Sequence, residues 1–216
     1  MIPSAAQPRA ARNHTAERDT EAALGRGGGT PASTGPPRSL RRHLLRLTER
    51  TLAFLGAAFL FYHLTLELTV MTSDSMTPAL QGTSYENGDR ILLEKVTGAI
   101  RAPQRWEIFF YYDEEGTPVA KRVVGMPGER ISISNRLVHI NGVPLERPKE
   151  IGPARYYAYG RLAGGREVAC GDGYFMLGDS SIDSLDSRYT GVVTRDRFRG
   201  RAWLIVAPPA RRGWVR

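Results

Sequence analysis

Apolar residues are arranged in three different ways along the chain, and each arrangement predicts a different kind of structure. Residues 1–38 contain almost no large apolar residues and are rich in Ala, Gly, Pro, Ser, Thr and Arg. Burial in such a segment cannot offset the entropy lost on ordering, so we expect a disordered basic tail. Residues 44–63 are mainly apolar, and residues 64–216 contain many short apolar runs that are typical of β-strands.

The apolar segment at 44–63 predicts a single N-terminal transmembrane helix that anchors the chain. The twenty residues from Thr51 to Val70, at about 1.5 Å each in a helix, would span roughly the 30 Å of bilayer hydrocarbon. Residues 64–70 alternate with period two, so we expect the helix to pass into a strand outside the membrane. A cleaved signal peptide is the alternative interpretation. By the positive-inside rule, the N-terminus is expected in the cytoplasm because of Arg41, Arg42, Arg46 and Arg50.

Residues 64–216 predict one mostly β domain of about 150 residues. Turn-forming pairs separate its short strand-like runs, and Asn141-Gly142 is typical of a two-residue β-hairpin. We find no convincing helical period after the apolar segment, and no internal repeat. The predicted strands are Arg90–Val96, Trp106–Tyr112, Pro118–Val124, Glu129–Ser134, Leu137–Ile140, Tyr174–Leu177 and Arg201–Ala207.

Charge and cysteine content narrow the functional classes. The 216 residues carry a formal net charge of +8. Residues 1–50 hold nine arginines against four acidic residues, so about five of the surplus charges lie there. No zinc-finger, helix-turn-helix or RNA-binding aromatic pattern accompanies them, so we expect no nucleic-acid partner. The single cysteine, Cys170, excludes a disulfide framework and a cysteine-rich zinc site.

Two serines that follow residues 64–70, Ser73 and Ser75, are candidates for nucleophilic chemistry. If the extended chain continues, they face the same way, so one hydroxyl could attack while the other assists. A serine nucleophile needs a base. Of the four histidines only His139 is plausibly placed, and no acidic residue lies near it in the sequence. The alternative is that the paired serines simply cap a turn.

A lysine is the other candidate base. The chain holds three lysines and 27 arginines, and arginine does not deprotonate in proteins. On a strand, Lys121 shares its face with Val119 and Val123, while Arg122 points the other way. Burial that lowers the lysine pKa by about 2–3 units would make the neutral amine available near neutral pH. The alternative is an edge-strand lysine whose ammonium extends to water.

A third cluster, at residues 178–191, is dense in short hydrogen-bonding side chains and follows an apolar strand. A hydroxyl such as that of Ser184 could hold a buried ammonium in place. Asp186 and Arg188 could form a local ion pair that fixes the shape of the loop. The alternative is an ordinary surface turn rich in Ser and Asp.

Taken together, these clusters resemble the type I signal peptidase family of Ser-Lys proteases, in the family's own order over roughly residues 45–207. The long, specific motifs and the apolar segment before them carry the resemblance. The matching segments are Ser73-Asp74-Ser75-Met76-x-Pro78, Asn87-Gly88-Asp89-Arg90-x-Leu92-x-x-Lys95, Lys121-Arg122-Val123-Val124-Gly125-Met126-Pro127-Gly128-Glu129 and Gly178-Asp179-…-Ser184-x-Asp186-Ser187-Arg188-x-x-Gly191.

The resemblance implies a role for each matching residue. Ser75 would be the nucleophile and Lys121 its general base, with the oxyanion hole formed by the Ser75 backbone N–H and the Ser73 hydroxyl. Ser184 would orient Lys121. The remaining implied positions are Asp179, Asp186 and Arg188 as supporting residues and Met76 in substrate binding.

The resemblance also implies a fold, a substrate and a location. The fold would be a signal-peptidase-like antiparallel β domain behind a single transmembrane helix. The enzyme would remove signal peptides from exported preproteins after small residues, using no metal or cofactor. It would be a single-pass protein of the bacterial cytoplasmic membrane, in contact with lipid, with its catalytic domain at 64–216 outside the cytoplasm. The oligomeric state is not predicted.

Three other functions are compatible with parts of the pattern. A specialised maturation peptidase, for example for conjugative pilin, would use the same residues. A cytoplasmic Ser-Lys self-cleaving repressor would need a folded DNA-binding head, whereas residues 1–38 predict disorder. A non-catalytic membrane-anchored module could bind preproteins without cutting them.

Overall fold

The computed structural model describes residues 38–152 and 154–216. Two compact units divide between Leu47 and Thr48, and helix α1, Arg38–Thr65, contains the division. The tail predicted at 1–38 lies outside the described residues except for Arg38, which begins α1. Its disorder therefore stays a prediction.

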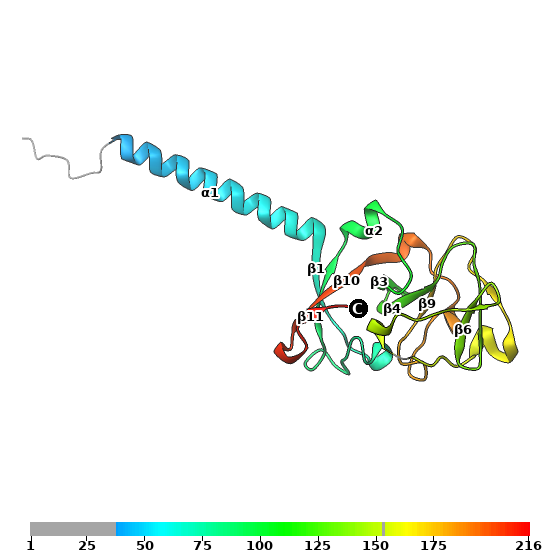
Figure 1. Ribbon diagram of the computed structural model, residues 1–216. Helices are drawn as coiled ribbons and strands as arrows, with labels where there is room; N and C mark the ends of the chain where they lie inside the picture. The colour runs from blue at the N-terminus through cyan, green and yellow to red at the C-terminus, as the bar shows by residue number, and fades with distance from the viewer. Residues whose placement is uncertain (1–37, 153) are drawn as a thin grey trace, which may run out of the picture. The chain divides into compact units, whose positions relative to one another are not determined.

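The second unit contains every strand of the described residues, and these strands pair antiparallel (Figure 1). The larger strands are β1 Leu66–Val70, β2 Arg90–Glu94, β3 Ile108–Tyr112, β4 Pro118–Gly125, β5 Arg130–Ser134, β6 Leu137–Ile140 and β10 Phe198–Ala207. The shorter strands are β7 Val143–Pro144, β8 Val168–Ala169, β9 Phe175–Leu177 and β11 Gly213–Trp214. The short helices are α2 Val96–Ile100, α3 Ser187–Thr190 and the 3₁₀ turns η1 Asp74–Met76, η2 Lys149–Ile151, η3 Gly160–Gly165, η4 Arg195–Arg197 and η5 Pro209–Arg211.

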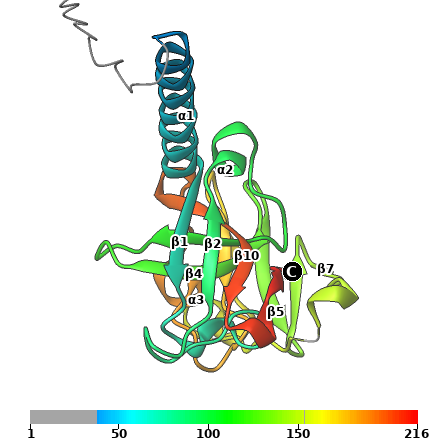
Figure 2. The same ribbon diagram turned by 90° about the vertical axis from the view of Figure 1, so that its left-hand side faces the viewer.

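The described strands form two sheets. The larger sheet has the order β1-β2-β10-β3-β4-β9, with β11 added to β10, and the smaller one has the order β7-β6-β5-β8. Figure 2 shows β1, β2 and β10 side by side, although β10 lies more than a hundred residues further along the chain. This closure brings the C-terminal part of the chain next to the segment between β1 and β2.

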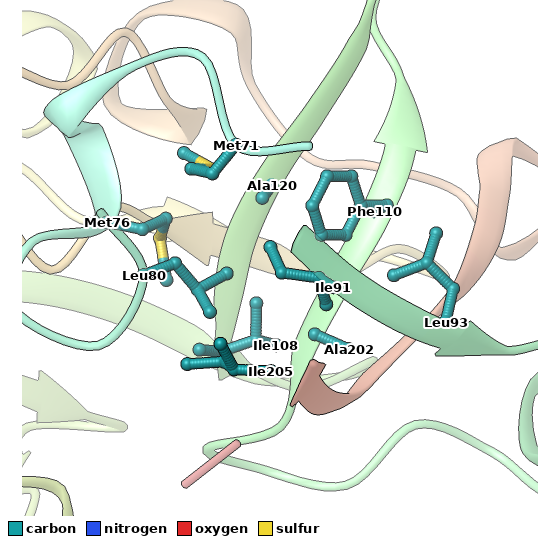
Figure 3. Packing of buried hydrophobic residues seen from close by; sticks show 10 residues of the cluster. All are labelled: Met71, Met76, Leu80, Ile91, Leu93, Ile108, Phe110, Ala120, Ala202 and Ile205. Carbon is teal, nitrogen blue, oxygen red and sulfur yellow. The ribbon is translucent and has the colours of Figure 1, made fainter. Parts of the chain in front are cut away.

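Alternation along the strands places one apolar face of the larger sheet in a core. Ile91 and Leu93 of β2 are fully buried there, and the turn before β2 adds Met76 and Leu80. Figure 3 shows these side chains packed with Phe110 and their neighbours. A second cluster lies around Val124, Ile131 and Phe175, and a third around Phe109, Val123 and Met176.

The mostly β fold predicted from the sequence is found, with strands close to all seven predicted ranges. The Asn141-Gly142 hairpin is confirmed: both residues have positive φ, and β6 pairs with β7 across them. Two short helices, α2 and α3, were not expected. Each has five residues or fewer, which is too short to show a helical period in the sequence.

The transmembrane span predicted at 44–63 is not found. The structure has a helix there, α1, which begins earlier than predicted and runs to Thr65. Among the described residues, no helix is both long and apolar enough to cross a membrane. The physical reason lies in the sequence of α1: its apolar run starts only after Glu49 and Arg50 and is interrupted by His63.

Candidate active site

The side chains of Ser75 and Lys121 are in contact beside the larger sheet. Lys121 lies on β4, paired with Phe109 of β3, and Ser75 lies in the 3₁₀ turn η1 that follows β1. The Lys121 Nζ donates a hydrogen bond of 2.7 Å to the Ser75 Oγ. Only 3% of Lys121 and 4% of Ser75 is exposed. The two residues that the sequence predicted as base and nucleophile are thus in direct contact, 46 residues apart in the chain.

The second serine also reaches this contact. Ser73 is extended, and its Oγ lies 3.1 Å from the Ser75 Oγ. The regular strand has already ended at Val70, so the shared direction of the two hydroxyls does not come from a continuous strand as we expected. It comes from the turn, in which the chain bends at Asp74 and brings Ser75 beside its neighbour.

Burial lowers the pKa of Lys121. Loss of contact with water lowers the pKa of Lys121 from its ordinary value to about 8, because a buried ammonium loses its hydration. The carboxylate of Asp186 acts in the opposite direction and the Arg188 guanidinium in the same direction, each by less than burial. A substantial fraction of the amine is therefore neutral at mildly alkaline pH, and neutral amine is the form that accepts a proton from a hydroxyl.

The serines and the lysine open onto a cleft of about 230 Å³. Tyr111 and Val119 supply apolar wall, while Asp113, Asp183 and Arg197 place charges around it. Leu185 also lines the cleft, with 70% of its surface exposed. An extended peptide could therefore reach the Ser75 hydroxyl from solvent although the hydroxyl itself is nearly buried.

The loop after β9 is fixed by a buried ion pair. Arg188 donates to both carboxylate oxygens of Asp186, at 2.8 and 2.9 Å, and both side chains are fully buried. The carboxylate also accepts the Gly178 N–H at 3.0 Å, and Arg188 reaches on to the hydroxyl of Ser181 at 2.7 Å. The predicted local pair of Asp186 and Arg188 is present.

This loop touches the backbone of Ser75. The Ser180 N–H donates to the Ser75 carbonyl oxygen at 3.1 Å. A Cβ at Gly178 would collide with that same carbonyl and with the Ser184 side chain. Glycine is therefore required at 178 for the loop and the turn to pack together.

A second buried pair supports the same loop from β4. Arg122, next to Lys121 but on the opposite face, donates to both oxygens of Asp179, at 2.8 and 2.5 Å. Arg147 adds a longer contact of 3.3 Å to that carboxylate. Arg122 and Arg147 were not among the predicted site residues. Arg122 was predicted only to point away from Lys121, and the sequence offered no signal for Arg147.

Three other predicted residues do not join the contact. The Ser184 hydroxyl is buried and has no hydrogen-bond partner in the described part of the chain, so its role in orienting Lys121 stays a prediction. Met76 has no exposed surface and packs in the core instead of lining the cleft, and its contact with substrate likewise stays a prediction (Figure 3). His139 lies on β6 of the smaller sheet, where its Nδ1 contacts the Leu137 carbonyl.

Within residues 38–152 and 154–216, no cluster of three or more His, Cys, Asp or Glu side chains could hold a metal ion.

A buried serine that is hydrogen-bonded to a buried lysine, beside a cleft in a β fold, is an arrangement compatible with a serine peptidase. Comparison with known proteins identifies the group: residues 44–207 match the family described as signal peptidase, peptidase S26. The chain belongs to this family and is a serine endopeptidase of the signal peptidase I kind.

Individual relatives agree with the family match. The chain is 31% identical to the probable signal peptidase I-2 of Synechocystis over 154 residues, which cover 68% of this chain and 66% of that protein. It is also 31% identical to the signal peptidase I of Leptolyngbya laminosa, over 68% of this chain and 71% of that one. A solved signal peptidase I from Enterococcus faecalis V583 aligns at 30% identity over 47% of this chain and 97% of its own, with a TM-score of 0.38, too low to define a shared fold.

Proposed function

We propose that this peptidase removes N-terminal signal peptides from exported preproteins by a Ser-Lys acyl-enzyme mechanism. The observation that carries the proposal is the 2.7 Å hydrogen bond between the Lys121 Nζ and the Ser75 Oγ in a site that is almost closed to water. The names of the relatives support the substrate class, because they are signal peptidases I.

In the first half of the reaction, neutral Lys121 accepts the Ser75 hydroxyl proton as the oxygen attacks the carbonyl carbon of the scissile bond. The developing oxyanion accepts hydrogen bonds from the Ser75 backbone N–H and the Ser73 hydroxyl. The protonated lysine then gives its proton to the leaving amine, the C–N bond breaks, and the signal peptide remains as an ester on Ser75. Each oxyanion donor in such a site contributes about 3–4 kcal/mol to transition-state stabilisation.

In the second half, Lys121 is neutral again and accepts a proton from water. The hydroxide attacks the ester, the oxyanion forms in the same position, and the protonated lysine returns its proton to the Ser75 oxygen. Asp186, Arg188 and Asp179 act as positioning residues, because their ion pairs hold the loop that bonds to the Ser75 backbone. Ser184 would orient the lysine, and Met76 would support the substrate-binding turn from its core side.

Processing of a purified preprotein in detergent tests this proposal. We expect Ser75→Ala and Lys121→Arg to abolish cleavage. The second variant keeps the charge but removes the base, because arginine does not give up its proton. Lys149→Arg is the matched control, since Lys149 is an exposed lysine on η2 outside the cleft, and it should process at the parent rate. Cleavage by Lys121→Arg at a measurable fraction of the parent rate would show that another group is the base.

The pH profile gives a second measure of the same assignment. With the pKa of Lys121 at about 8, kcat should fall about tenfold for each pH unit below that value, as the ammonium form accumulates. A labelled preprotein followed from pH 5 to 10 provides the curve. A rate that stays flat down to pH 5 would contradict a lysine base.

A further inference from the structure

The segment that carries Ser75 is a long loop whose two ends are joined by one aspartate. The loop connects β1 to β2, across residues 71–89. The Asp89 backbone accepts the Met71 N–H at 2.9 Å and donates to the Gln81 carbonyl at 2.8 Å, and the Asp89 carboxylate accepts the Gln81 N–H at 2.8 Å. Asp89 therefore ties the residue that follows β1 to the part of the loop after the nucleophile turn.

Close backbone contact adds to this closure. A Cβ at either Gly82 or Gly88 would collide with the Met71 carbonyl oxygen. The start of the loop, four residues before Ser75, is therefore packed directly against its far end. A small displacement at Asp89 would consequently move the chain on both sides of the nucleophile.

Asp89 is itself held by an arginine from the far end of the chain. Arg211 lies in η5, after β10, and its Nε donates to both Asp89 carboxylate oxygens, at 2.8 and 3.1 Å. Its Nη2 donates to the same carboxylate at 2.9 Å and to the carbonyls of Pro78 and Ala79 at 3.3 and 3.2 Å. The Asp89 side chain is 1% exposed, so its charge has almost no water to stabilise it, while Arg211 is 28% exposed.

We propose that Arg211 is a positioning residue for the nucleophile. One guanidinium binds the aspartate that closes the loop and also two carbonyls that lie three and four residues after Ser75. The planar fork of arginine makes these contacts together, which an ammonium group cannot do from one site. The contacts fix where Ser75 stands relative to Lys121, and an error of about 1 Å in such a position lowers rates by roughly a hundredfold.

This inference rests on the proposed roles of Ser75 and Lys121, and it predicts an effect on the lysine as well. Met76 and Leu80 on the loop are fully buried. If the loop loosens, water reaches the Lys121 ammonium, the burial that depresses its pKa weakens, and the pKa rises toward its ordinary value. The acid limb of the kcat profile then moves to higher pH.

The experiment compares Arg211→Gln and Arg211→Lys with the full-length parent in detergent. The substrate is a fluorogenic peptide with alanine at the first and third positions before the scissile bond. We expect Arg211→Gln to lower kcat about tenfold or more, to leave KM within about threefold, and to move the acid limb upward by about half a pH unit or more. Arg211→Lys should show the same changes at smaller size. Arg212→Gln is the matched control, because Arg212 is an exposed neighbour whose Nε binds the Val206 carbonyl instead, and it should behave as the parent.

A purely structural role would give a different result. Loss of folded protein lowers the total rate but leaves the pH at which half the activity is lost unchanged. An Arg211→Gln variant with the parent's kcat per folded molecule and the parent's acid limb would overturn the inference. If Arg211→Gln does not fold, Arg211→Lys decides the question by the same two measurements.

Acylation separates this inference from the proposed function. A mechanism-based acylating inhibitor should label Ser75 in the parent, and mass spectrometry of the digested protein locates the adduct. No adduct on Ser75 in the parent would mean that the proposed function fails. A labelled parent together with an Arg211→Gln variant that is labelled at the same rate would mean that only the role of Arg211 fails.

Discussion

The turn that carries Ser75 and the loop at 178–191 line the same cleft, but different interactions stabilise them. Beside the turn, Met76 and Leu80 are fully buried in an apolar cluster (Figure 3). The loop instead contains the buried pair of Asp186 and Arg188 and is joined to β4 by the pair of Asp179 and Arg122. Apolar packing is tolerant of shape-conserving changes, whereas a buried charge that loses its partner is costly. The two sides of the site should therefore differ in which substitutions they tolerate.

The largest effect is expected on the ionic side. Asp186→Asn leaves the fully buried Arg188 without its carboxylate, and removing one member of a buried pair costs about 3–5 kcal/mol of unfolding free energy. Urea unfolding followed by circular dichroism measures the loss. Asp172→Asn, at an exposed aspartate just before β9, serves as the control and should leave the midpoint unchanged. Equal midpoints for the two variants would mean that the pair does not stabilise the loop.

A smaller loss is expected on the apolar side, and it should depend on the shape of the replacement. Leu80→Ala leaves a cavity in the cluster and should cost about 2–5 kcal/mol. Met76→Leu keeps the volume and should cost less than about 1.5 kcal/mol. The same unfolding experiment measures both. If Met76→Leu were as damaging as Leu80→Ala, packing on this side would be as intolerant as the ion pair.

A change of the opposite sign, a gain in stability, is expected at the lysine between the two sides. Below pH 8 Lys121 is charged in both the folded and the unfolded chain, so the folded protein bears the full cost of burying the ammonium. Lys121→Met removes this cost and should stabilise the inactive protein by up to about 3 kcal/mol at pH 7.

The size of that gain changes with pH in a defined way. The unfolded lysine keeps its proton up to about its ordinary pKa of 10.5, whereas the folded one loses it near 8. The parent's stability therefore rises between pH 8 and 10.5, and the advantage of Lys121→Met should fade over that window. Unfolding free energies measured at pH 7, 9 and 10.5 test this. An advantage that is the same at all three pH values would mean that burial does not depress the lysine pKa.

The sequence predicted the strands well because short runs rich in β-branched and aromatic residues are separated by turn-forming pairs, as β3 and β4 illustrate. It could not predict the pairing of β2 with β10, because no local pattern relates segments more than a hundred residues apart. The contact between Ser75 and Lys121 was expected only from the family resemblance. Composition pointed to a lysine as the base, but nothing in the spacing of the two residues places them side by side.

The residues proposed to position Ser75 were harder still to predict from the sequence. Asp89 was visible as part of a motif, but its partner Arg211 is one of 27 arginines and follows an ordinary proline-rich turn. Nothing in the sequence distinguishes it from Arg212, which makes a local contact only. The two arginines differ only in the folded chain, where the C-terminal segment lies beside the loop at 71–89 and Arg211 contacts Asp89.

The neighbouring positions of Lys121 and Arg122 on β4 have a consequence for how misfolded molecules behave. The lysine contacts Ser75 on one face and the arginine contacts Asp179 on the other. If β4 slipped by one residue against β3, the guanidinium would take the place of the amine beside the serine. Such a molecule would carry a group that never releases its proton and could not cut any peptide. Chains with a slipped β4 would then be inactive and would not cleave other peptides. Titration of reactive Ser75 would therefore count the molecules of a refolded sample in which β4 has the correct register.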